Sequence, residues 1–181
     1  PGVLDVPEAS LGDFVLVDGA SKSYAMTGWR LGYSYSSGAV AQKFSELQSQ
    51  ITSNTTTTSQ VAAIEAFGNV QAADASIAAM GEAFTRRRDL VTRRMSELMP
   101  GVPFIRPEGA FYLYFRVDGF FDEEVTSGTS WCARLLEQQG VALVPGAAFG
   151  DDRWVRMSFA SSDEALEEAL VRIAAMTGAA V

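Results

Sequence analysis

The segment from Ser21 to Tyr33 constrains the fold of this chain most strongly, because it places charged and hydroxyl side chains between two strand-like runs. Residues 14–18 form an apolar run of strand length, and residues 31–35 have a similar character. Glycines at positions 19, 28 and 32 mark the ends of the runs and the turn between them. The pattern predicts a strand, an irregular loop and a second strand that returns from the loop.

Lys22 is one of only two lysines in the chain and lies at the start of the predicted loop. A lysine at a strand-to-loop junction, near polar backbone and another cation, can lose the ammonium form and become a nucleophile. Arg30 supplies a planar fork suited to phosphate, and Ser21 adds a hydroxyl donor. Together the three predict a site for an aldehyde that carries a phosphate. The alternative is an ordinary loop lysine with a surface arginine.

Residues 21–33 read Ser-Lys-Ser-Tyr-Ala-Met-Thr-Gly-Trp-Arg-Leu-Gly-Tyr. This order resembles the pyridoxal-phosphate lysine signature of the class I aminotransferases, a fold-type I family that includes the aspartate aminotransferases. The resemblance implies that Lys22 forms a Schiff base with pyridoxal 5′-phosphate and acts as the catalytic base. It also implies that Ser21 and Arg30 bind the cofactor phosphate.

The resemblance further implies that the chain is the C-terminal half of such an enzyme, because family members are much longer and carry the lysine past their middle. The expected fold class is α/β. Residues 1–70 would be the C-terminal part of the large cofactor-binding domain, with a mostly parallel sheet, and residues 71–181 the interdomain helix and an α+β small domain.

Arg156 lies in the middle of a second strand-like run, residues 154–159. An arginine among apolar residues must find an anion or is costly to bury. It could pair with Asp151 or Asp152 as an edge-strand charge, or it could be a fork for a substrate carboxylate. The run Val-Arg-Met-Ser-Phe-Ala at 155–160 resembles the family pattern Val-Arg-x-Ser-x-Ala, which implies that Arg156 binds the substrate carboxylate.

Hydrophobic periodicity predicts the remaining elements. Helices are expected at residues 39–51, from about 58 to 67, from about 71 to 98, at 129–139, and from about 163 onward; strands are expected at 109–115, 141–144 and 154–159. The hydroxyl-rich residues 52–59 have the composition of a linker. The resemblance instead implies that they lie near the active site at a dimer interface, where Asn54 could face the partner's cofactor.

Composition excludes several classes of protein. A net charge of -8 argues against nucleic-acid binding, and the basic residues 86–94 are interspersed with acids, as on a solvated helix face. The single cysteine, Cys132, excludes an internal disulfide and is expected in the core; the absence of histidine excludes Ser-His and Cys-His catalysis and zinc-type clusters. No apolar run has the length of a membrane span and no leader is apparent, so we expect a cytoplasmic protein without a metal.

The resemblance implies an aminotransferase that moves an amino group between an amino acid and a 2-oxo acid, as a homodimer. The alternatives are another fold-type I enzyme, such as a C–S lyase or an aminocyclopropane-carboxylate-synthase-like enzyme, and a non-catalytic fragment. In the family, several residues of the site precede the part that this chain resembles, so the chain alone is expected to be inactive. The sequence does not reveal the substrate, and Arg106 is not assigned a role.

Overall fold

The computed structural model describes Pro7 and residues 14–178, and the chain divides into two compact units, Pro1–Ala79 and Met80–Val181. The boundary falls inside α4 (Val70–Leu98), a helix of 29 residues that contributes to both units. The sequence placed a boundary near residue 70, and the assignment of residues 1–70 to a larger domain stays a prediction. No helix among the described residues combines the length and the apolar character needed to cross a membrane.

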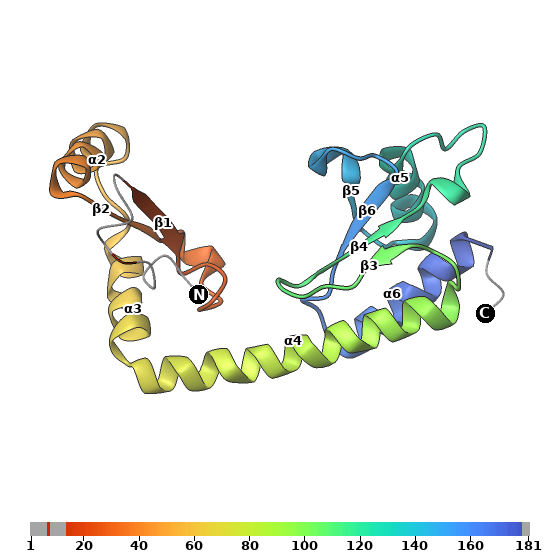
Figure 1. Cartoon of the computed structure of the whole chain (residues 1–181), viewed down its shortest axis with the longest axis horizontal. Helices are drawn as coiled ribbons and strands as arrows, with labels where there is room; N and C mark the ends of the chain where they lie inside the picture. The colour runs from red at the N-terminus through yellow and green to blue at the C-terminus, as the bar shows by residue number, and fades with distance from the viewer. Residues whose placement is uncertain (1–6, 8–13, 179–181) are drawn as a thin grey trace. The chain divides into compact units, whose positions relative to one another are not determined.

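The described part of the first unit contains a hairpin, the short 3₁₀ helix η2 (Thr27–Trp29) within its loop, and two α-helices before α4 begins (Figure 1). β1 (Val15–Gly19) pairs antiparallel with β2 (Gly32–Ser36), which confirms the predicted strand, loop and strand. α2 (Gly38–Ile51) and α3 (Thr57–Gly68) follow. The described strands of this unit are antiparallel, so this part of the chain does not contain the mostly parallel sheet that we expected of the large domain.

The linker interpretation of residues 52–59 is wrong at its C-terminal end. α3 begins at Thr57, with Thr56 at the N-cap position. Ser59 is buried, and its hydroxyl donates a hydrogen bond to the Trp29 carbonyl oxygen at 2.6 Å. The segment therefore supports the loop between β1 and β2, because a buried hydroxyl is favourable only when it has a partner.

The second unit is an antiparallel sheet of four strands in the order β3-β4-β6-β5, packed with helices. The strands are β3 (Phe104–Ile105), β4 (Tyr112–Arg116), β5 (Val144–Pro145) and β6 (Trp154–Ser158), and the helices are α5 (Gly128–Gln139), α6 (Asp163–Met176) and the C-terminal part of α4. The short 3₁₀ helices η3 (Asp118–Phe120) and η4 (Gly146–Phe149) lie in its loops. The predicted strand at 141–144 is wrong except at Val144, because β5 forms only where the chain meets β6.

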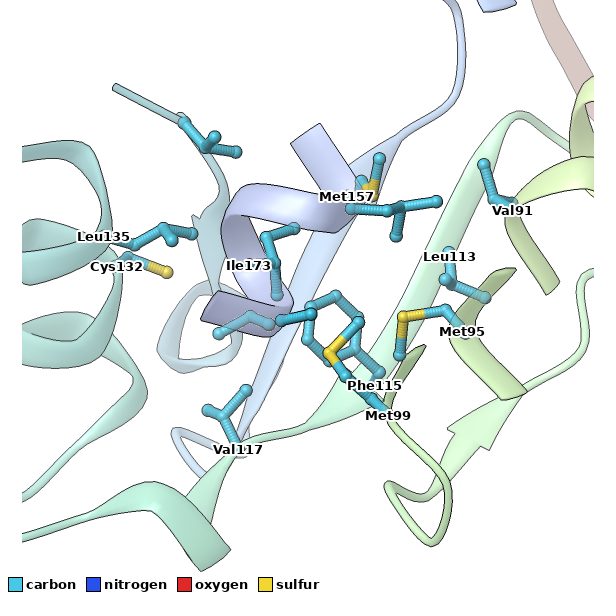
Figure 2. Close-up of a cluster of buried hydrophobic side chains, with 14 of the residues drawn as sticks. Val91, Met95, Met99, Leu113, Phe115, Val117, Cys132, Leu135, Met157 and Ile173 are labelled. Carbon is cyan, nitrogen blue, oxygen red and sulfur yellow. The ribbon is translucent and has the colours of Figure 1, made fainter. Parts of the chain in front are cut away.

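One face of this sheet forms a continuous hydrophobic core with the three helices (Figure 2). Burial alternates along β4 and β6, so Leu113, Phe115, Val155 and Met157 point into the core, as the two-residue period of a strand requires. Val91 and Met95 of α4, Trp131, Cys132 and Leu135 of α5, and Leu166, Leu170 and Ile173 of α6 complete it. The core position of Cys132 is confirmed.

The basic face of α4 has a more specific role than solvation. Arg86 and Arg87 bind the two carboxylate oxygens of Asp163 at 3.1 and 3.0 Å, and Arg94 binds Glu167 at 2.7 Å. Asp163 and Glu167 belong to α6, so these ion pairs join the two helices. The neighbouring arginines lower the pKa of the Asp163 carboxyl by hydrogen bonding to its charged form.

Candidate active site

The loop between β1 and β2 carries Ser21, Lys22 and Arg30 at one end of the hairpin. The two ends of this loop are held together, because the Ala20 N–H donates a hydrogen bond to the Leu31 carbonyl oxygen at 3.2 Å. The pairing of Gly19 with Gly32 precedes this contact. The hairpin therefore brings the three predicted cofactor residues into one loop although eight positions separate Lys22 from Arg30.

The loop is closed internally by short-range hydrogen bonds. The Thr27 hydroxyl donates to the Ser21 carbonyl oxygen at 2.9 Å, and the Ala25 N–H donates to the Lys22 carbonyl oxygen at 3.2 Å. Ala25 and Arg30 have φ angles of 54° and 52°. Residues with a β-carbon adopt this left-handed region at a cost, and such strain gathers at functional sites.

The side chains of Lys22 and Arg30 are exposed, and Ser21 is half-buried. Among the described residues, the Lys22 side chain is therefore not shielded from solvent by the loop. Arg30 donates a hydrogen bond from Nη1 to the Thr27 carbonyl oxygen at 3.2 Å, which orients its guanidinium from within the loop. The two cationic groups are accessible to a small anionic molecule.

Arg156 has a different setting, in the middle of β6. It lies opposite Tyr114 of β4 and Val144 of β5 and is half-buried. Its guanidinium carbon is 4.1 Å from the centroid of the Tyr112 ring and 4.5 Å from that of the Phe149 ring. Its Nε atom is buried and has no hydrogen-bond partner among the described residues.

The acidic residues that Arg156 was expected to pair with are bound elsewhere. Asp151 accepts hydrogen bonds from Arg153 Nε at 2.9 Å and Nη2 at 2.6 Å, and these lower the pKa of its carboxyl to about 2. Asp152 accepts hydrogen bonds from the Thr129 N–H and hydroxyl, each at 3.0 Å. The edge-strand ion pair is therefore wrong, and Arg156 remains a cation without an internal counter-ion among the described residues.

A comparison of all the arginines separates two from the rest. Every arginine other than Arg30 and Arg156 forms an ion pair of 4.0 Å or less with a carboxylate of the described chain. Arg30 and Arg156 form none with a described residue. Two guanidinium groups that lack counter-ions among the described residues fit two external anions, and the Lys22 amine and Ser21 hydroxyl in the same loop as Arg30 are of the kinds that bind the aldehyde and phosphate of pyridoxal phosphate.

The structure also shows the surroundings of Arg106 and Asn54, two residues whose roles the sequence left open. Arg106 binds Asp89 at 3.0 Å, so it has an internal partner. Asn54 lines a cavity of about 690 Å³ in the first unit, together with residues of β2, α2 and α3. Its expected position facing a partner's cofactor stays a prediction. No group of three or more potential metal ligands occurs in the part of the chain that the structure describes.

Three residues that contact candidate site elements were not identified from the sequence: Tyr112, Phe149 and Ser59. Tyr112 could have been noticed from the alternation of β4, because it lies two residues before Tyr114, the residue opposite Arg156. Phe149 follows the Pro145-Gly146 turn, but its contact with Arg156 depends on the path of η4. Ser59 gave no signal beyond its place in a hydroxyl-rich segment.

Comparisons with known proteins identify relatives along most of the chain. A family model described as aminotransferase class I and II matches residues 4–173. The curated aspartate aminotransferase of Thermotoga maritima is 43% identical over 171 residues, which cover 94% of this chain and 41% of the relative. The aspartate/prephenate aminotransferase of Cereibacter sphaeroides is 42% identical over 164 residues, covering 87% and 40%. The chain thus spans about two fifths of the length of these relatives.

Solved structures agree with these matches. The aspartate aminotransferase of Thermus thermophilus with maleate superposes with a TM-score of 0.81 at 38% identity, over 90% of this chain and 41% of that one. The crystal structure of the Thermotoga maritima enzyme gives a TM-score of 0.80 at 42% identity, over 97% and 42%. The fold is therefore α/β, that of part of an aspartate aminotransferase. The chain belongs to the class I and II aminotransferase family.

Proposed function

We propose that this chain is the C-terminal part of a pyridoxal-phosphate-dependent aminotransferase that moves an amino group between an amino acid and a 2-oxo acid. The observation that carries the proposal is the pair of guanidinium groups, Arg30 and Arg156, that lack a carboxylate partner among the described residues. The similarity to aspartate aminotransferases supports it. We propose further that the whole enzyme is a homodimer and acts in the cytoplasm.

Each site residue has a role that its chemistry suits. Lys22 would hold pyridoxal phosphate through Nζ, and Ser21 and Arg30 would bind its phosphate by hydrogen bonds and charge. Bound there, the cofactor supplies an electron sink for the α-carbon of the substrate. Arg156 would bind the substrate's carboxylate and orient the α-carbon. The Lys22 amine, once released from the cofactor, would accept the α-proton and return it, as a general base and acid.

The role of Lys22 is testable on the chain itself, with Lys43 as the internal control. Pyridoxal phosphate is added to the chain, the mixture is reduced with borohydride, and the adducts are mapped by peptide mass spectrometry. We expect the adduct to concentrate on Lys22, and the variant Arg30→Ala to reduce that preference. Lys43 binds Glu46 at 2.7 Å on the exposed face of α2, so it represents an ordinary lysine. Equal labelling of the two lysines would contradict the assignment of Lys22.

The reaction type is testable on a full-length protein that contains this sequence. Aspartate, the substrate in the names of several relatives, is the first amino acid to test. Transamination requires a 2-oxo acid as acceptor, whereas a lyase or ring-closing enzyme does not. We expect the new amino acid to appear only when 2-oxoglutarate is present. Release of ammonia or pyruvate without an acceptor would overturn the proposal in favour of a lyase.

A further inference from the structure

We infer that Tyr112 and Phe149 are positioning residues for Arg156, and that their rings hold its guanidinium as an unneutralised cation ready to bind a small-molecule carboxylate. The inference rests on the proposed role of Arg156 as the carboxylate fork. It adds to that role the two residues that position the guanidinium and leave its charge unneutralised.

The register of the sheet places Tyr112 beside Arg156. β4 and β6 pair antiparallel, with Tyr114 opposite Arg156 and Tyr112 opposite Ser158. Leu113 and Met157 are buried in the core, so Tyr112 and Arg156 lie together on the other face of the sheet. Diagonal neighbours on one face are within reach of long and aromatic side chains. The distance of 4.1 Å between the guanidinium carbon and the ring centroid follows from this register.

A tightly fixed turn places Phe149 on the same guanidinium. Phe149 is the last residue of η4, which begins at Gly146. A β-carbon at Gly146 would lie 2.1 Å from the Asp151 carbonyl oxygen and 2.5 Å from the Trp154 carbonyl oxygen, so the backbone is packed too closely for any other residue. Gly150, which follows Phe149, has a φ of 93°, and this lets the chain reverse towards β6.

Phe149 does not behave as a core residue. Its relative exposure is 49%, so its burial contributes little to the stability of the fold. Its ring contacts the Arg156 guanidinium and meets the Tyr114 ring edge-on at 6.2 Å. The half-exposed Phe149 ring therefore acts by positioning the Arg156 guanidinium, and it does not act by filling the core.

Aromatic rings hold a cation differently from carboxylates. Arg116 and Arg153, in the same unit, each bind a carboxylate with two nitrogen atoms, and their charge is neutralised. A ring attracts a guanidinium through its quadrupole and carries no net charge. The Nη donors of Arg156 are therefore still available for the bidentate binding of an external carboxylate, whereas its Nε is buried. Because the side chain is already ordered, binding loses less rotamer freedom.

The test is NMR of the arginine Nε–Hε groups in the full ¹⁵N-labelled chain, titrated with 2-oxoglutarate and, as an uncharged control, with succinamide. The variants are Tyr112→Leu, Phe149→Leu, the conservative Tyr112→Phe, and Tyr35→Leu as a matched control at an exposed tyrosine of β2. The indole N–H of the buried Trp131 reports whether the core is intact.

In the wild type we expect a ring-shifted Arg156 resonance and a saturable response to 2-oxoglutarate alone. Each leucine variant should lose part of the ring shift and raise the dissociation constant by about two- to thirty-fold, the range of cation–π contacts. Tyr112→Phe and Tyr35→Leu should bind as the wild type does. If Tyr112→Leu also moves the Trp131 resonance, Phe149→Leu decides, because Phe149 is outside the core.

The outcomes separate the two claims. Unchanged affinity in the leucine variants, with a wild type that binds, would overturn the positioning role and leave the carboxylate role of Arg156 standing. A wild-type Arg156 resonance that does not respond to 2-oxoglutarate would overturn the carboxylate role and the inference with it. The adduct experiment at Lys22 is independent of both.

Discussion

The two compact units differ in how they treat their apolar side chains. In the second unit, residues of α4, α5, α6, β4 and β6 form one continuous buried cluster. In the described part of the first unit, the buried apolar residues are Ala20, Met26 and Ala63, whereas large apolar side chains of β1, β2, α2 and α3 are exposed. The second unit is therefore stabilised by its own core. The first is held by strand pairing and local hydrogen bonds, and its apolar surface is of the kind that other protein normally covers.

The residues with proposed roles are divided between the two units. Arg156 belongs to the unit with a core, and its immediate surroundings are complete enough to show how it is held. Lys22 and Arg30 belong to the first unit, whose described residues form no such cluster, and their side chains are exposed. The motif that is most specific in the sequence therefore has the less buried surroundings among the described residues, and the inactivity of the chain alone stays a prediction.

Two leucine-to-alanine variants test whether the two units differ in core packing. Leu113 is fully buried, so Leu113→Ala should lower the free energy of unfolding by about 2–5 kcal/mol through lost contacts and a cavity. Leu47 of α2 is 58% exposed, and Leu47→Ala should change it by less than about 0.5 kcal/mol. Urea unfolding followed by circular dichroism measures both. Similar losses in the two variants would show that the first unit has a core of its own in solution.

A glycine substitution tests how closely the backbone is packed before Phe149 in the second unit. Gly146→Ala would force a β-carbon into backbone atoms of Asp151 and Trp154, and overpacking of this kind costs about 1–3 kcal/mol. Gly119→Ala is the control, because nothing lies within 4 Å of its added β-carbon. Thermal unfolding checks the difference. Equal midpoints for the two variants would mean that the turn before Phe149 is not fixed as described.

Much of the fold was predictable because local patterns and packing agree. The helices at 38–51, 70–98 and 128–139 were predicted within one residue at each end, since their apolar spacing is regular and glycine or proline follows several of them. The strand predicted at 141–144 was wrong for a physical reason. Val141 is apolar and buried, but it is buried in a loop, and an apolar run alone does not distinguish a strand from a buried loop.

Candidate site residues could be named from the sequence where a residue would act through its own chemistry, and their roles stay predictions. Arg30 and Arg156 were identified from motifs, and both lack internal ion pairs among the described residues. The neighbours of Arg156 were harder to identify, because the alternation of β4 points to Tyr112 only once the register with β6 is known, and the contact of Phe149 depends on the path of η4. Ser59 likewise contacts Trp29 across 30 positions of sequence, which no local pattern encodes.

The smallest expected effect tests whether the first unit depends on such single contacts. Ser59→Ala removes the hydrogen bond to the Trp29 carbonyl oxygen, and a bond of this kind contributes about 0.5–1.5 kcal/mol. Because the described residues of that unit form no large core, the loss should appear as local opening of residues 20–31, measured by faster amide exchange there, with exchange in the second unit unchanged. Ser49→Ala is the control, since the exposed Ser49 hydroxyl donates only to the Glu46 carbonyl of its own helix. Exchange that stays slow in Ser59→Ala would show that the loop is held by strand pairing alone, whereas faster exchange throughout the chain would show that the two units unfold as one.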